Sequence, residues 1–175
     1  MKRFIVIGFL VLLLFSVVAC EKSPAEKYKE FSEEMVAEFG KQLATEQSYI
    51  GQSIERSNKV KVYENLFELS NQSLHKAMTA DVPEQYKDAH DYMISSFEKI
   101  GDYYAGAAFF QAQWIQIEAD LENLQNQLEM GMIPPSRIDY YKEQKVEPQE
   151  ERALVLEQLK TDAITEMDNH LKFLE

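Results

Sequence analysis

Residues 84–130 decide the fold, and they read EQYKDAHDYMISSFEKIGDYYAGAAFFQAQWIQIEADLENLQNQLEM. Apolar side chains recur there every three or four residues, which is the spacing of one helix face. That face consists of Tyr86, Met93, Phe97, Ile100, Tyr104, Ala107, Trp114, Leu121, Leu124 and Leu128. A second stripe with Phe110 and Ile117 predicts a helix that packs on two sides. The glycines and alanines between residues 101 and 108 should let a neighbouring helix approach closely.

Two further apolar stripes precede this segment. The first consists of Tyr28, Phe31, Met35, Phe39 and Leu43, and the second of Val62, Leu66, Leu69, Leu74 and Met78. The pattern weakens between them, so the stretch forms either one very long helix or two helices broken near Ser57. Ser23 and Pro24 are typical of a helix start, and Pro83 separates this stretch from the next helix.

The carboxyl-terminal part of the chain predicts one more long helix. Gly131 and the prolines that follow it end the long central helix, and a short helical piece is expected around residues 138–142. The last helix begins at Glu147-Pro148, and its face consists of Leu156, Leu159, Ala163, Met167, Leu171 and Leu174. The sequence therefore predicts an all-α fold, an elongated antiparallel bundle of three or four helices, as a single domain over residues 28–175.

Helix lengths indicate where apolar surface would remain uncovered. At 1.5 Å per residue the helix over 84–130 is about 70 Å long, and the helix over 149–174 only about 39 Å. In an up-down-up arrangement the last helix covers only the membrane-proximal base of the hairpin. Residues 60–105 are then covered by a broken first helix or expose Phe67, Phe97 and Ile100, and exposed apolar surface is typical of interaction sites.

The amino terminus has the features of an export signal. Lys2 and Arg3 precede an apolar run over residues 4–19, which ends at Cys20, the single cysteine. A basic start, an apolar stretch and a small residue before the cut are typical of a secretory signal. The run is shorter than the roughly 20 residues of a spanning helix. An uncleaved anchor and an ordinary signal with an incidental cysteine are the alternatives.

Residues 17–20, Val-Val-Ala-Cys, resemble the lipobox of bacterial lipoproteins. The resemblance implies a signal peptide over residues 1–19 and a diacylglyceryl group on the Cys20 thiol. It implies a lipidated tether over residues 20–27 and a protein held on the extracytoplasmic face of a bacterial membrane. Two or more acyl chains give stable anchoring, whereas one gives only marginal binding. The resemblance covers the signal segment alone.

The charge of the chain excludes some classes of partner. The formal net charge is −12, and it is about −14 without Lys2 and Arg3. Nucleic-acid binding needs clustered Lys and Arg, so we expect no nucleic-acid partner. Repulsion from anionic headgroups should make a tethered domain project away from the membrane.

No pattern of catalytic residues occurs. None of the three histidines, at 75, 90 and 170, has a partner at metal-ligand spacing. His90 lies between Asp88 and Asp91, either as a weak surface metal site or as part of a solvated acidic first turn. Nucleophile-elbow, phosphate-loop and dinucleotide motifs are absent. We therefore expect no enzyme activity, no metal and no cofactor.

Two functions follow as hypotheses. The first is a non-enzymatic interaction module that offers a helix face to a protein partner or to a second copy of the chain. The second is a binding protein for a small apolar molecule held near Tyr104, Phe110 and Trp114. Such aromatic groups line ligand pockets, but they also form the cores of helical bundles.

Overall fold

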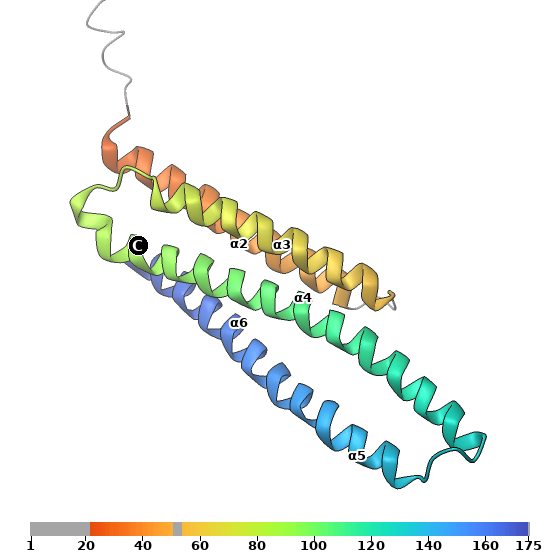
Figure 1. Cartoon of the computed structure of the whole chain (residues 1–175). Coiled ribbons are helices and arrows are strands. Elements are labelled where there is room, and N and C mark those ends of the chain that lie inside the picture. Colours follow the sequence, from red (N-terminus) through yellow and green to blue (C-terminus); the bar gives the residue numbers. More distant parts are fainter. Residues whose placement is uncertain (1–21, 51–53, 175) are drawn as a thin grey trace, which may run out of the picture.

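The computed structural model describes residues 22–50 and 54–174, which fold almost entirely into α-helices (Figure 1). The elements are α2 (Pro24–Ile50), α3 (Arg56–Met78), a 3-10 turn η1 (Glu84–Tyr86), α4 (Lys87–Glu129), α5 (Ser136–Lys145) and α6 (Glu147–Leu174). Four of the helices are long, which confirms the predicted all-α bundle. None of the described helices combines the length and apolar character needed to cross a membrane. Cys20 and the signal segment lie outside the described residues.

The first long stretch forms two helices that return on one another. α2 ends at Ile50 and α3 begins at Arg56, so the break predicted near Ser57 exists and lies slightly earlier. α3 runs antiparallel beside α2, α4 packs along α3, and α6 returns along α4 (Figure 1). The turn over residues 79–83 therefore lies at the end of the bundle where α2 begins. We call this end the base.

Of the two arrangements that the sequence left open, the structure shows the one in which the broken first helix folds back, and not the up-down-up arrangement. Because α3 folds back, α4 starts at the base and extends beyond the α2–α3 pair (Figure 1). Phe97 and Ile100 are completely buried, and Phe67 is partly buried against the core. The prediction of an exposed interaction surface at these three residues is wrong. The less covered part of the long helix is its second half.

Local sequence signals account for the helix ends. Ser23 Oγ accepts a hydrogen bond from the Glu26 amide (3.2 Å), and Glu26 Oε2 accepts one from the Ser23 amide (2.8 Å), which is a capping box. At the far end of α4, Gly131 adopts φ +70°. The amides of Gly131 and Met132 donate to the carbonyls of Leu128 and Gln127, both at 2.9 Å. This is a Schellman motif, and its left-handed residue favours glycine.

The core lies where α2, α3, α4 and α6 meet. Phe39 of α2 packs edge-on against Phe97 of α4, with 5.6 Å between the ring centroids. The largest completely buried apolar side chains are Met35, Leu66, Met93, Phe97, Ile100 and Tyr104. Gly106 allows α6 to approach α4, since a Cβ at this position would overlap Leu156 Cδ2. The predicted close approach at the small residues is confirmed.

Candidate functional site

Two buried histidines join the helices at the base. Nδ1 of His90 in α4 lies 3.0 Å from the Tyr28 hydroxyl of α2, and Nε2 of the same ring lies 2.9 Å from the Ala77 carbonyl of α3. Nε2 of His170 in α6 lies 2.5 Å from the Ser32 hydroxyl, and Nδ1 of that ring lies 2.7 Å from the Ala89 carbonyl. A carbonyl can only accept, so the ring nitrogen facing it must carry the proton. The other ring nitrogen of each histidine is hydrogen-bonded to the hydroxyl.

These contacts make the histidines structural. His90 is only 5% exposed, so it belongs neither to a solvated turn nor to a surface metal site. Burial lowers the pKa of His170 below its ordinary value, even though the hydrogen bond to the Ala89 carbonyl raises it. Among the described residues, no group of three His, Cys, Asp or Glu side chains is arranged to hold a metal ion. Both rings crosslink helices of the bundle.

A carboxylate is buried midway along the bundle. Glu46 of α2 is 1% exposed, and its Oε2 lies 2.8 Å from Nζ of Lys160 in α6. The Tyr103 hydroxyl of α4 donates to Glu46 Oε1. Burial and the bond to Glu46 raise the pKa of Tyr103, so its proton is retained at physiological pH. The carboxylate is enclosed by its partners, and this cluster serves to join three helices.

Of the three aromatic residues predicted to line an apolar pocket, Tyr104 lies in the core, Phe110 packs against the core, and Trp114 is half-buried outside it. Tyr104 is completely buried, with its ring 5.3 Å from that of Tyr103. Phe110 meets Trp114 edge-on at 6.2 Å, and the guanidinium of Arg56 lies 5.2 Å from the Trp114 ring. No ring contact joins Tyr104 to the Phe110–Trp114 pair among the described residues. Their arrangement gives no support to the apolar-ligand hypothesis.

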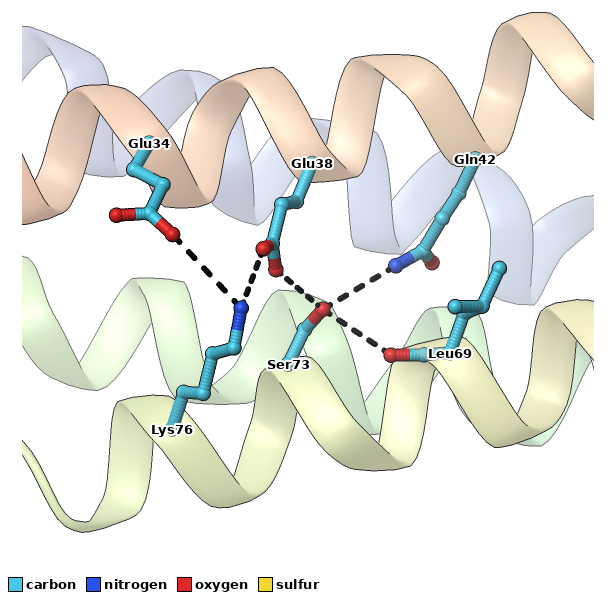
Figure 2. Close-up of polar contacts among 6 residues, drawn as sticks. All are labelled: Glu34, Glu38, Gln42, Leu69, Ser73 and Lys76. Carbon is cyan, nitrogen blue, oxygen red and sulfur yellow. Dashed lines mark hydrogen bonds and ion pairs between the residues drawn. The ribbon is translucent and has the colours of Figure 1, made fainter.

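A polar groove runs between α2 and α3 (Figure 2). It holds a hollow of about 160 Å³ that is partly open to solvent. We call it the α2–α3 groove, and its lining residues are Glu38, Lys41, Gln42, Thr45, Leu69, Gln72, Ser73 and Lys76. On both helices these residues follow spacings of 3, 1 and 3, so each helix presents one polar face to the other. That repeated spacing is a signal in the sequence, but the groove was not among the predicted sites.

Ion pairs and hydrogen bonds order this groove. Lys76 Nζ lies 2.5 Å from Glu38 Oε1 and 3.8 Å from a Glu34 oxygen (Figure 2). Ser73 Oγ lies 2.9 Å from Glu38 Oε2. Burial raises the pKa of Glu38, but the hydrogen bonds from Lys76 and Ser73 outweigh it and hold the pKa below its ordinary value. Glu38 is therefore ionised at neutral pH.

The second half of α4 forms a thinner arm with α5 and the start of α6 (Figure 1). We call this region, residues 109–155, the distal arm. The Tyr141 hydroxyl donates to Asp120 Oδ2 (2.7 Å), and Arg152 donates to Gln113. The large apolar side chains exposed on the arm are Phe109, Ile115, Met130, Met132, Tyr140, Leu154 and Val155. These side chains are spread along the arm, from Phe109 and Val155, at the level where α3 begins, to Met130 and Met132 at the far end of α4.

Comparison with protein-family models, with curated proteins and with solved structures finds no match for this chain.

Proposed function

We propose that the protein is a lipid-anchored, extracytoplasmic interaction module that binds a protein partner through its distal arm. The main support for this proposal is the apolar surface of the arm, on which Leu154 is 73% exposed and Val155 is 61% exposed. Exposed apolar side chains of this kind are typical of protein-binding surfaces when they gather in one region. In this proposal the lipobox-like segment at residues 17–20 provides the membrane anchor, and the apolar surface of the arm provides the binding site.

The orientation of the bundle supports the proposal. α2, which begins four residues after Cys20, starts at the base, whereas α4 ends at the opposite end of the molecule (Figure 1). α4 has 43 residues, which correspond to about 65 Å at 1.5 Å per residue. A lipid on Cys20 would hold the base at the membrane, and the arm would extend outward. The formal net charge of −12 opposes contact between the bundle and anionic headgroups.

The chemistry of the arm indicates the type of contact. Large apolar side chains are exposed there among charged ones, and the guanidinium of Arg152 lies 5.3 Å from the Phe109 ring. Apolar anchors with a polar rim are the usual anatomy of a protein interface. No comparable set of accessible acid, base or nucleophile groups stands out among the described residues. Binding accounts for these observations better than catalysis.

Site-specific photo-crosslinking in intact cells tests the proposal. A photoreactive residue replaces Val155 on the arm in one variant and Met78 at the base in another. These positions are matched, being 61% and 64% exposed. We expect a discrete adduct with a protein from Val155 and none from Met78. Equal adducts from both positions, or none from Val155, would contradict the proposal, and an adduct of twice the chain mass would identify the partner as a second copy.

A further inference from the structure

We propose that the base of the bundle is a proton-sensitive latch, in which protonation of His170 releases the last two turns of α6 from α2 and α4 while the rest of the bundle stays folded. The segment concerned is residues 168–174, which lies beside the start of α4 (Figure 1). A release of this kind would change the surface of the base in response to pH. The proposal is independent of the distal arm.

His170 fastens α6 to two other helices. Its ring is completely buried, Nδ1 donates to the Ala89 carbonyl of α4 at 2.7 Å, and Nε2 lies 2.5 Å from the Ser32 hydroxyl of α2. Burial holds the pKa of His170 below its ordinary value, so at pH 7.5 the ring is neutral and Nε2 accepts from Ser32. A proton on Nε2 would remove the acceptor of the Ser32 hydroxyl and leave a charge in a buried site.

The helices packed against the ring do not offset such a charge. The titratable group that faces His170 from α4 is His90, and a charge on His90 lowers the pKa of His170 further. From α2 the ring meets the Ser32 hydroxyl. The charged residues near Ser32 on that helix, Lys29 and Glu33, are exposed. Among the described residues, these two helices therefore bring no carboxylate into hydrogen-bond contact with the ring.

The carboxylates of α6 and of the start of α4 are paired or solvated. Glu166, one turn before His170, is paired with Lys99 of α4. Asp91 of α4 and Asp168 of α6 are exposed. A buried histidinium without a carboxylate partner is costly, so protonation favours a state in which the ring reaches water.

Few other contacts hold the end of α6. Among residues 168–174, His170 is the only buried side chain. Phe173 stacks on Tyr92 of α4 with 5.6 Å between the ring centroids, but it is 56% exposed. Opening of a helix end that buries little apolar surface costs less free energy than global unfolding. The segment can therefore detach while the core remains packed.

Hydrogen–deuterium exchange on the detergent-solubilised full-length chain tests the proposal at pH 7.5 and pH 5.5, with rates corrected for the intrinsic pH dependence of exchange. In the released state His170 has its ordinary pKa of about 6.5, so a lower pH favours release. We expect the protection of residues 168–174 to fall about fivefold or more. We expect about 1 M urea to leave this protection unchanged, because a local opening exposes little surface.

Two outcomes would overturn the proposal. The first is protection of residues 168–174 that does not change between the two pH values. The second is protection that equals that of residues 97–104 in the centre of α4 and falls with urea in the same way, because the segment would then open only by global unfolding.

Two matched variants link the response to the ring. His170→Gln removes the titrating group, so the pH response of residues 168–174 should be lost, whereas His75→Gln at an exposed position on α3 should retain it. A response that persists in folded His170→Gln would overturn the proposal. NMR titration of the unmodified chain covers the case in which His170→Gln does not fold. The ring of His170 should titrate below about 6.5, and a pKa at or above that value would equally overturn the proposal.

Discussion

Nε2 of His90 in α4 lies 2.9 Å from the carbonyl oxygen of Ala77 in α3, and both groups are buried. This contact requires a proton on Nε2, and Nδ1 is hydrogen-bonded to the Tyr28 hydroxyl, 3.0 Å away. A single ring in this way joins three helices. The matching contacts of His170 with Ser32 and Ala89 make the base of the bundle depend on two buried histidines.

The first prediction concerns pH. The pKa of folded His170 is lowered by burial, so the unfolded chain binds more protons near pH 6 than the folded chain does. The stabilisation from the neutral ring is present above the unfolded pKa of about 6.5, and it is lost as the pH falls below that value. We expect the free energy of unfolding in urea to fall by about 1 kcal/mol between pH 7.5 and pH 5.5.

Variants distinguish this effect from general acid denaturation. His75→Gln, at an exposed position on α3, should keep the pH dependence, and His170→Gln should reduce it. Ionised Glu38 also stabilises the fold, but the pKa of its carboxyl group is held below the ordinary value. This stabilisation is therefore lost only at a pH below the range from 7.5 to 5.5. A pH dependence that is identical in His170→Gln and in the unmodified chain would contradict the role of the ring.

The second prediction compares two helical glycines. Alanine is favoured over glycine in a helix by about 1 kcal/mol. A Cβ at Gly40 meets nothing within 4 Å, so Gly40→Ala should raise the free energy of unfolding by about that amount. A Cβ at Gly106 would overlap buried Leu156, which must change rotamer. We expect Gly106→Ala to be less stable than Gly40→Ala by about 1 kcal/mol or more, as measured by urea unfolding. Equal gains from both would show that α4 and α6 are not in close contact there.

The third prediction concerns the buried ion pair. Glu46→Ala leaves the Tyr103 hydroxyl and the Lys160 ammonium without their acceptor. The Lys160 side chain is only 16% exposed, so water replaces the lost contact poorly. We expect a loss of about 3 kcal/mol in the free energy of unfolding. Glu30→Ala breaks the exposed pair with Lys22 and should cost less than about 1 kcal/mol. Similar losses in the two variants would mean that burial of Glu46 adds nothing to the strength of its contacts.

The sequence predicts the helices well because their signals are local. The Ser23 cap and the break at Gly131 depend on neighbours a few residues away, and both are confirmed. Whether Phe97 is exposed depends on whether the first stretch folds back on itself. The apolar spacing is the same for a folded-back stretch and for one continuous helix, so the predicted exposure of Phe97 was wrong. Helix length alone therefore located the uncovered surface at the wrong end of α4.

The polar groups of the bundle were harder to predict. Gln42 and Glu46 continue the buried stripe of Met35 and Phe39, so their spacing marks them as polar residues on a core face. Their partners come from α3, α4 and α6, far away in the sequence. Only the three-dimensional arrangement shows that Glu46 is neutralised by Lys160 and that an oxygen of Gln42 remains unpaired.

The fourth prediction concerns the lipid. If Cys20 carries a diacylglyceryl group, the full-length chain should sediment with membranes, and detergent but not high salt should release it. Cys20→Ala removes the thiol that the lipobox-like segment would modify, so the chain should no longer carry a lipid. Mass spectrometry of the amino-terminal peptide checks this directly. An unmodified Cys20 in membrane-bound protein would contradict the lipoprotein assignment.

The most direct test of the distal arm as a binding surface uses a photoreactive residue in place of Phe109. It is combined with a second substitution that introduces a carboxylate, either on the arm or at the base. Phe109 is 54% exposed and lies beside Arg152 at the start of α6. A carboxylate buried in an apolar contact without a partner is costly. We predict that Val155→Glu, on the same arm, abolishes the protein adduct formed at Phe109 in intact cells, whereas Met78→Glu at the base leaves it unchanged. An adduct that persists in both variants would contradict the claim that the arm is the binding surface.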